Sequence, residues 1–185
     1  MSSTKPIRLT YAFDAFDAFD AYCGWCYGFG PALHEFAAVN ADRIELRVLS
    51  GGLFTGRRAL MDSADAATGL VALRSQPGAN ALDAAAAMQR AWYVDGRSLS
   101  DAAVYRDIAT ELGLDADAVG AAYVSPAART EAEADFLQVR RLGVDGYPTL
   151  LLHTAHGTDR QGGPVSSADA LTRALDQHLA AAAAA

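Results

Sequence analysis

Residues 19–29 read Phe-Asp-Ala-Tyr-Cys-Gly-Trp-Cys-Tyr-Gly-Phe, and they contain both cysteines of the 185-residue chain, Cys23 and Cys26. Two cysteines are too few to hold a chain of this length together as a disulfide framework. We therefore expect the two cysteines to take part in a chemical reaction rather than to stabilise the fold. Gly24 and Trp25 are the two residues between them.

The segments on either side of the cysteines predict a βαβ unit. Ile7–Phe13 alternates apolar and polar residues and is rich in β-branched and aromatic types, which predicts a strand. Tyr27–Asn40 has apolar residues along one face and predicts a helix, which Pro31 is expected to kink or to shift in its start. Arg43–Leu49 alternates again and predicts a second strand. Two strands joined by a helix form a parallel pair, so the cysteines lie at a strand-to-helix junction.

A Cys-x-x-Cys pair at such a junction is typical of a thioredoxin-like redox site. The N–H groups and the positive dipole end of the helix favour the thiolate of Cys23, which is the nucleophile. Cys26, one turn deeper and less exposed, is expected to resolve the mixed disulfide. One alternative is half of a zinc site, but zinc needs four ligands and no pair of histidines has ligand spacing near the motif. The other alternative is a pair of inert buried cysteines. We predict a redox pair and no metal site.

The middle of the chain predicts helices only. Residues 57–128 are rich in alanine and are punctuated by helix-ending and helix-starting residues, which predicts three or four helices. We expect this segment to be a helical insertion in a thioredoxin-like domain formed by residues 1–56 and 129–185. Trp92 and Tyr93 lie at amphipathic spacing within it and are expected in the core.

Three further elements are predicted after the insertion. Thr130 and Glu133 fit a capping box that begins a helix ending at Gly143. Thr149–Leu152 predicts a short buried strand, followed by a hairpin to a second short strand. Ser166 is expected to cap a final amphipathic helix. The whole pattern predicts an α/β fold with a βαβ unit, an all-helical insertion and a C-terminal ββα unit.

Tyr147 and Pro148 form an X–Pro turn directly before the predicted C-terminal strand. About 5–6% of X–Pro bonds in folded proteins are cis, and a tight turn of this kind is a candidate. The alternative is an ordinary trans proline that enters an edge strand.

Three copies of Phe-Asp-Ala run from Phe13 to Ala21. A period of three suits neither a strand nor a helix. An unpaired aspartate at every third position is too costly in a strand that is buried on both faces. We expect part of the repeat to loop out, or the strand to be displaced.

The sequence resembles the DsbA-like branch of the thioredoxin superfamily. The residues that carry the resemblance are the motif at 19–29, Gly51-Gly52-Leu53-Phe54 and the stretch from Gly143 to Thr149. The resemblance implies that Cys23 attacks, that Cys26 resolves, and that a cis proline at Pro148 faces the active site. It also implies that Tyr147 and Pro148 offer backbone to an extended substrate segment, while Trp25 lies at the substrate-binding surface.

Two features depart from the family pattern. The residues between the cysteines are Gly-Trp rather than the Pro-His of the periplasmic oxidase, and Trp25 can do little for a thiolate through charge. We therefore expect a less oxidising couple. Asp20, three residues before Cys23, is the better match to the family as a residue that influences the Cys23 pKa. Asp17, six residues before it, matches a buried proton acceptor of thioredoxins by count alone and is expected in an exposed loop.

The overall charge and hydropathy limit the kinds of partner that the sequence predicts. A formal net charge of −7 argues against sequence-independent binding to nucleic acid. No apolar run predicts a membrane span, and no signal sequence is recognisable, so we expect a cytoplasmic protein. The expected partner is a thiol or disulfide of a protein, a peptide or glutathione, with no cofactor required and the oligomeric state left open.

Two other functions remain open at this stage. One is a glutathione-dependent isomerase or transferase of the same superfamily, which the presence of both cysteines disfavours. The other is a non-enzymatic redox-sensing module in which the cysteine pair switches the binding of a partner.

Overall fold

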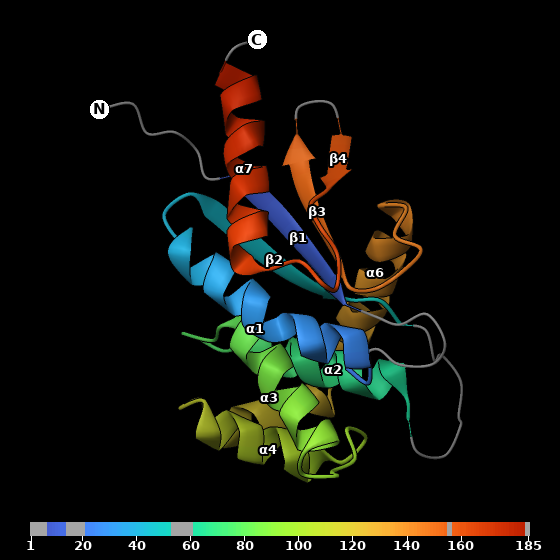
Figure 1. Cartoon of the computed structure of the whole chain (residues 1–185). Helices are drawn as coiled ribbons and strands as arrows, with labels where there is room; N and C mark the ends of the chain where they lie inside the picture. The colour runs from blue at the N-terminus through green and yellow to red at the C-terminus, as the bar shows by residue number, and fades with distance from the viewer. Residues whose placement is uncertain (1–6, 14–20, 53–60, 155–156, 184–185) are drawn as a thin grey trace.

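The computed structural model describes residues 7–13, 21–52, 61–154 and 157–183. Within these ranges the chain forms four strands and seven helices, which confirms the mixed α/β fold. The sheet has the order β2-β1-β3-β4 (Figure 1). The strands are β1 (Ile7–Phe13), β2 (Ile44–Ser50), β3 (Thr149–Thr154) and β4 (Gly157–Arg160). β1 runs parallel to β2, whereas β3 is antiparallel to both of its neighbours.

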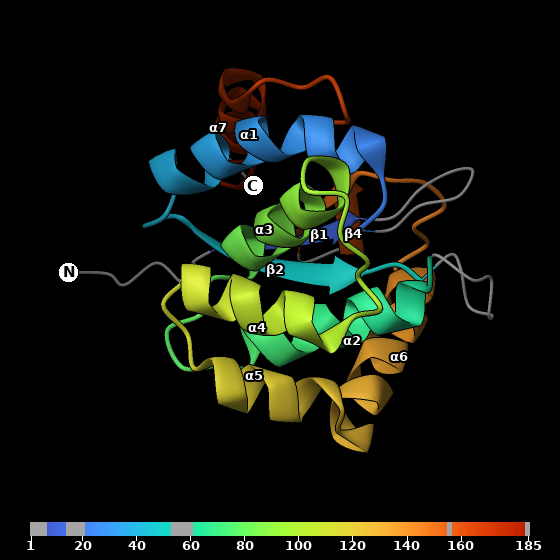
Figure 2. The same ribbon diagram turned by 90° about the horizontal axis from the view of Figure 1, so that it is seen from below.

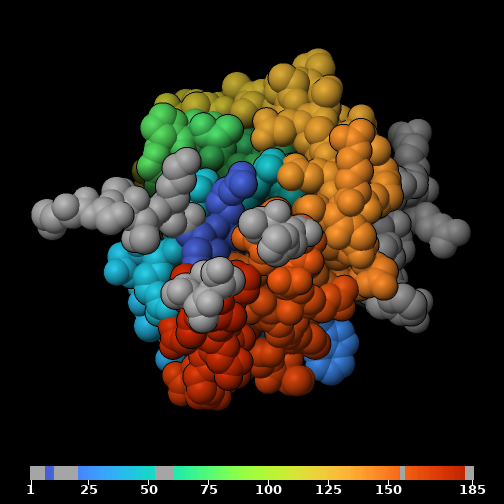
Figure 3. All heavy atoms as spheres, turned by 90° about the horizontal axis from the view of Figure 1, so that it is seen from above, coloured from blue at the N-terminus to red at the C-terminus, as the bar shows by residue number. Residues whose placement is uncertain are grey.

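Helices cover both faces of the sheet. α1 (Gly24–Val39) and α7 (Ala168–Ala183) lie on one face, and α6 (Pro126–Arg141) lies on the other (Figures 1 and 2). Seen from above, α7 lies beside the β3–β4 hairpin (Figure 3). In the described part of the chain, no helix is both long enough and apolar enough to cross a bilayer.

Four helices fill the segment that the sequence predicts as an insertion. They are α2 (Ser63–Arg74), α3 (Ala81–Tyr93), α4 (Ala102–Glu111) and α5 (Ala116–Tyr123). Each begins after a side chain that accepts backbone N–H groups of the first turn, and these N-caps are Asp62, Asn80, Asp101 and Asp115. The division into a thioredoxin-like domain and an insertion stays a prediction, and α6 runs across its second boundary.

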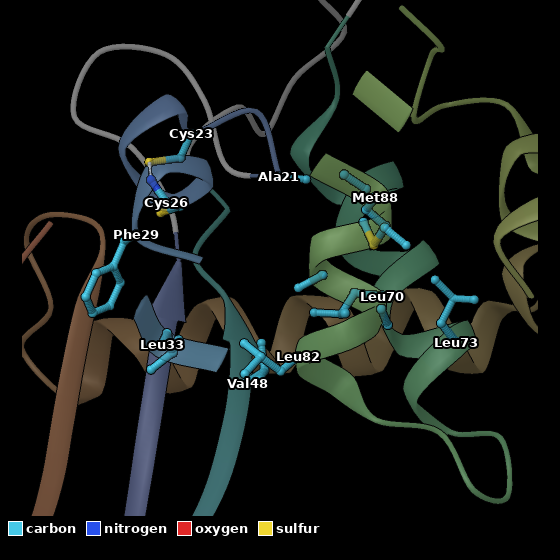
Figure 4. Close-up of a cluster of buried hydrophobic side chains, with 14 of the residues drawn as sticks. Ala21, Cys23, Cys26, Phe29, Leu33, Val48, Leu70, Leu73, Leu82 and Met88 are labelled. Atoms are coloured by element: carbon cyan, nitrogen blue, oxygen red, sulfur yellow. Dashed lines mark hydrogen bonds between the residues drawn. The ribbon is translucent and has the colours of Figure 1, made fainter. Parts of the chain in front are cut away.

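One continuous apolar core joins the sheet to these helices. Phe29 and Leu33 of α1 lie against the sheet, while Leu70 and Met88 come from α2 and α3 (Figure 4). All four side chains are at most 1% exposed. Each such side chain contributes about 1.5–3 kcal/mol when it leaves water, so the helical layer and the sheet stabilise one another.

An ion-pair network ties α2 to α6 and β2. The Arg74 guanidinium donates to Asp135 at 2.6 Å, to Glu131 at 2.7 Å and to the Val48 carbonyl at 3.0 Å. Burial raises the pKa of the Asp135 carboxyl, and the hydrogen bond and charge of Arg74 oppose that shift. The network holds α6 in register with the sheet.

Three predicted helix starts are wrong. α1 begins at Gly24 rather than Tyr27, because Cys23 is its N-cap and Pro31 is accommodated inside the helix. α6 begins at Pro126, because the Ser125 hydroxyl accepts the Ala128 N–H and proline suits the first helical turn.

Thr130, predicted as an N-cap, instead lies within α6 and donates its hydroxyl to the Pro126 carbonyl at 3.0 Å. α7 is capped by Ser167 rather than Ser166, since the Ser167 hydroxyl accepts the Ala170 N–H at 3.2 Å. Ser166 accepts the Gly163 N–H one turn earlier.

The strand predicted at Ile7–Phe13 is confirmed at both ends. β2 lies one residue later than its predicted range, and β3 extends two residues beyond its predicted end. The predicted loop in the Phe-Asp-Ala repeat falls on residues 14–20, which lie outside the described residues.

Candidate active site

Cys23 is the N-cap residue of α1, and Cys26 lies in the first turn of that helix (Figure 4). Cys23 has extended backbone angles, φ −78° and ψ 107°, and its Sγ accepts the backbone N–H of Cys26 at 3.1 Å. Sulfur therefore takes the place that a serine or aspartate oxygen fills at an ordinary helix start. The arrangement points the Cys23 Sγ at the N-terminal N–H groups, as the sequence predicts.

Both cysteines are in the thiol form, and both are enclosed. Cys23 is 1% exposed and Cys26 is 0% exposed, so the expected contrast in exposure is almost absent. Between the two cysteines, Trp25 is 66% exposed and presents an apolar surface next to the thiols.

A group of aromatic side chains supports the residue before Cys23. The Tyr93 hydroxyl donates to the Tyr22 backbone carbonyl, and the Tyr93 ring stacks on Tyr27 with centroids 5.0 Å apart. The Tyr22 ring meets Trp92 edge-on at 4.6 Å. The end of α3 thus holds the turn that carries the cysteines.

Tyr93 is a site residue that sequence reasoning missed. Its spacing in the sequence predicts a position in the core, but Tyr93 is 38% exposed. Nothing local in the sequence marks it, because its contact with Tyr22 spans 71 residues.

The Tyr147–Pro148 peptide bond is cis, and Pro148 is buried while Tyr147 is partly exposed. Thr149, the next residue, pairs with Ala12 near the end of β1. This register places Pro148, the residue before β3, next to the C-terminal end of β1. Tyr147 packs against the same core cluster that contains Cys23 and Cys26.

The remaining predicted site residues, Asp17 and Asp20, lie outside the described residues. Within the described ranges, no group of His, Cys, Asp and Glu side chains could hold a metal ion. The chemistry that the described site offers is that of the two thiols.

The solved structures that resemble this one include two whose names refer to disulfide chemistry. The structure aligns with a protein from Nitrosomonas europaea provisionally described as a protein disulfide isomerase, with a TM-score of 0.81 and 20% identity over 95% of this chain and 98% of that one. The cytosolic disulfide reductase DsbM from Pseudomonas aeruginosa aligns with a TM-score of 0.74 and 24% identity, over 93% of this chain and 98% of that one. DsbA of Pseudomonas aeruginosa aligns with a TM-score of 0.69 and 20% identity, over 100% and 90% of the two chains.

At the level of sequence, no protein with a curated description matches the chain significantly. The family model described as the DSBA-like thioredoxin domain matches residues 17–176, which include both cysteines, the helical segment and Pro148. The chain therefore belongs to the DsbA-like thioredoxin domain family, a family of thiol:disulfide oxidoreductases.

Proposed function

We propose that this protein exchanges disulfides through its Cys23-Gly24-Trp25-Cys26 motif, with Cys23 as the attacking thiol and Cys26 as the resolving thiol. The observation that carries the proposal is the hydrogen bond from the Cys26 N–H to the Cys23 Sγ at the start of α1. A backbone donor and the positive end of the helix both favour the thiolate over the thiol. The thiolate is the form that attacks a disulfide.

The two thiols supply the two electrons of one reduction. The Cys23 thiolate attacks one sulfur of a substrate disulfide, a mixed disulfide forms, and the other substrate sulfur leaves as a thiolate that solvent protonates. Cys26 gives its proton to solvent and attacks the Cys23 sulfur, which forms the Cys23–Cys26 disulfide and releases the second substrate sulfur as a thiolate that is protonated in turn. The substrate disulfide is reduced by two electrons, and two equivalents of an external thiol, or one dithiol, return the enzyme to its dithiol form. Run backwards, the same steps oxidise a substrate dithiol.

Three residues are proposed to contact the substrate. Trp25 is proposed because it is 66% exposed between the cysteines. Tyr147 and Pro148 are proposed to present backbone to an extended substrate segment, in the manner of an added strand. The pairing of Thr149 with the end of β1 supports this, since it brings the start of β3 to the same edge of the sheet as the end of β1.

We further propose that glutathione is a thiol partner and that the protein acts in the cytoplasm. Support comes from the likeness to the cytosolic disulfide reductase DsbM, which has also been solved with glutathione. A reducing compartment keeps such a pair in the dithiol form. The test of the location is fractionation of the native host. Recovery of the protein from any compartment other than the cytoplasm would contradict the proposal.

The test is turnover of a disulfide substrate by the wild type, Cys23→Ser and Cys26→Ser. We expect Cys23→Ser to lower the rate of insulin reduction by dithiothreitol to the rate without the protein. With dithiothreitol left out, Cys26→Ser should retain the first step and accumulate a mixed disulfide that mass spectrometry detects. Asp20→Asn and Asp17→Asn, assayed alongside, test whether either carboxylate influences the pH at which Cys23 reacts with iodoacetamide.

Two outcomes would contradict the proposal. If Cys23→Ser turns over insulin as fast as the wild type, the assignment of the nucleophile is wrong. If the wild type forms the Cys23–Cys26 disulfide reversibly but never turns over a substrate, the pair is a redox switch rather than an enzyme site.

A further inference from the structure

The face of the sheet that α6 covers has a polar half that disulfide exchange does not use. Toward the C-terminal end of β1, this face carries an apolar cluster formed by Leu49, Val139, Val144 and Leu151. Toward the start of β1 there is a cavity of about 200 Å³, whose polar lining consists of Arg8, Thr10, Glu45, Arg47, Gln138 and His153. α1, which begins after Cys23, lies on the opposite face of the sheet (Figure 1).

Strand alternation brings four of the lining side chains to the same face. Arg8 and Thr10 are two residues apart on β1, and Glu45 and Arg47 are two residues apart on β2. The parallel register pairs Arg8 with Glu45 and Thr10 with Arg47. Residues i and i+2 of a strand point the same way, and paired residues of neighbouring strands lie side by side. The two guanidinium groups therefore share one small area of the sheet.

The lining is rich in hydrogen-bond donors without acceptors. Within the described ranges, no hydrogen bond or ion pair is found for the side chains of Arg8, Arg47 or Gln138, although all three line the cavity. Each guanidinium carries five N–H donors and no acceptor, and the glutamine amide adds two donors and one acceptor. A ligand with several acceptor oxygens would satisfy these groups.

Thr10 and His153 supply one more donor, whichever tautomer the imidazole adopts. The Thr10 Oγ1 and the His153 Nε2 lie 2.6 Å apart, and Thr10 is only 2% exposed. If Nε2 accepts the threonine proton, the neutral ring carries its hydrogen on Nδ1. If Nε2 donates instead, the Thr10 hydroxyl keeps its own hydrogen. In both cases one N–H or O–H remains for an acceptor outside the pair.

Positive charge exceeds negative charge around His153. Burial lowers the pKa of His153, and the positive charges of Arg8 and Arg47 lower it further. Among the described lining residues, Glu45 is the only carboxylate. α6 contributes no charged group to this described lining, and β4 pairs His153 with the uncharged Thr158. With a neutral imidazole, the cavity therefore carries two positive charges against one negative charge.

We propose that this cavity binds a phosphate group, either as inorganic phosphate or as part of a small phosphate monoester. A phosphate monoester carries about −1.5 to −2 charges at pH 7 and three strong acceptor oxygens. Guanidinium groups bind such oxygens through two parallel hydrogen bonds. The donors of Arg8, Arg47 and Gln138 outnumber the acceptor oxygens of Glu45, so the lining has donors left for the phosphate.

The test is a titration of the whole protein with inorganic phosphate and, separately, with glycerol phosphate, followed by nuclear magnetic resonance. The ring signals of His153 and the amide signals of Thr10 and Gln138 report on the cavity. A parallel titration with chloride measures the effect of ionic strength alone. We expect saturable shifts at the lining residues with phosphate. We also expect phosphate to raise the pKa of His153, because a bound anion offsets the charges of Arg8 and Arg47.

Four variants test the assignment of the site. Arg8→Gln and Arg47→Gln should each weaken phosphate binding about fivefold or more, because a charged hydrogen-bond donor is lost. Arg173→Gln is the matched control, since it removes the same charge at an exposed position of α7, on the other face of the sheet, and should bind within about twofold of the wild type. Glu45→Gln removes the competing carboxylate and should tighten binding about threefold, which a damaged fold would not produce.

The outcomes decide both the site and the source of the phosphate. Binding of both probes supports a site for phosphate monoesters, and binding of inorganic phosphate alone supports a site for the free anion. The absence of saturable shifts with either probe would overturn the proposal, as would shifts that chloride reproduces. An equal loss of affinity in Arg47→Gln and Arg173→Gln would show a general effect of net charge and would overturn it too. Every readout is binding, so the outcome does not depend on disulfide exchange.

Discussion

The Tyr93 hydroxyl at the end of α3 donates a hydrogen bond to the backbone carbonyl of Tyr22, the residue before Cys23. The two residues are 71 positions apart in the sequence. Because Tyr93 also stacks on Tyr27, α3 contacts the motif from both sides of the cysteine pair. The helical layer therefore holds the backbone on which the thiols are mounted.

Tyr93→Phe removes this hydrogen bond and keeps the ring. We expect a loss of about 1 kcal/mol in the free energy of unfolding, which is typical of one hydrogen bond, and a change in the rate at which Cys23 reacts with iodoacetamide. Urea denaturation and alkylation kinetics measure the two effects. Tyr27→Phe is the control, since it keeps the stack and leaves the Tyr22 carbonyl bonded. Equal behaviour of the two variants would show that the Tyr93 hydroxyl does not support the site.

Trp25→His should make the Cys23–Cys26 couple more oxidising. An imidazolium beside the thiolate stabilises the reduced form, and one unit of thiolate pKa corresponds to about 30 mV for a two-electron couple. We expect the reduction potential to rise by about 30 mV or more at pH 6, and by less at pH 8 where the imidazole is neutral. Trp25 is 66% exposed, so the exchange leaves the core intact. Redox titration against glutathione, with Trp25→Gln as the uncharged control, measures the shift, and an unchanged potential at pH 6 would refute it.

Gly69→Ala and Gly28→Ala should change stability in opposite directions. A Cβ at Gly69 in α2 would lie 1.9 Å from the Tyr105 ring, so α2 or the ring has to move, and we expect a loss of about 1–3 kcal/mol. A Cβ at Gly28 in α1 meets nothing within 4 Å, and we expect a gain of about 0.5–1 kcal/mol from helix propensity alone. Thermal unfolding of the two variants checks both signs. A stabilised Gly69→Ala would mean that α2 and α4 pack less closely than the structure has them.

Arg74→Met should destabilise the protein by about 3 kcal/mol at neutral pH, because the Asp135 carboxylate, whose side chain is 3% exposed, loses its buried partner. Burial already raises the pKa of Asp135, and without Arg74 nothing on α2 opposes that shift. The penalty therefore grows as the pH rises from the unfolded pKa of the carboxyl through its raised folded pKa, and it shrinks as the pH is lowered.

Urea denaturation at pH 7 and pH 5 measures the dependence on pH. Glu131→Gln removes the exposed partner of Arg74 and should change stability by no more than about 0.5 kcal/mol. A loss in Arg74→Met that is the same at both pH values would contradict the assignment of the effect to Asp135.

Local patterns accounted for the elements that depend on nearest neighbours. The alternation of Ile7–Phe13 predicts β1 at its observed bounds, because period-two burial is a property of the strand itself. The position of Cys23 before a helix predicts the cap that its sulfur forms. The helix starts at Gly24, Pro126 and Ala168 were placed wrongly, because several nearby residues could cap each helix and the choice depends on where the chain enters it.

The sequence by itself determined the chemistry available to this protein, namely two thiols separated by two residues at the start of a helix, in an α/β chain with a helical middle. Only the tertiary structure decided how that chemistry is enclosed. The bond from Tyr93 to the Tyr22 carbonyl and the stack of Tyr93 on Tyr27 both depend on where α3 packs against α1. Contacts between residues far apart in the chain follow from the packing of whole elements, and no local periodicity encodes them.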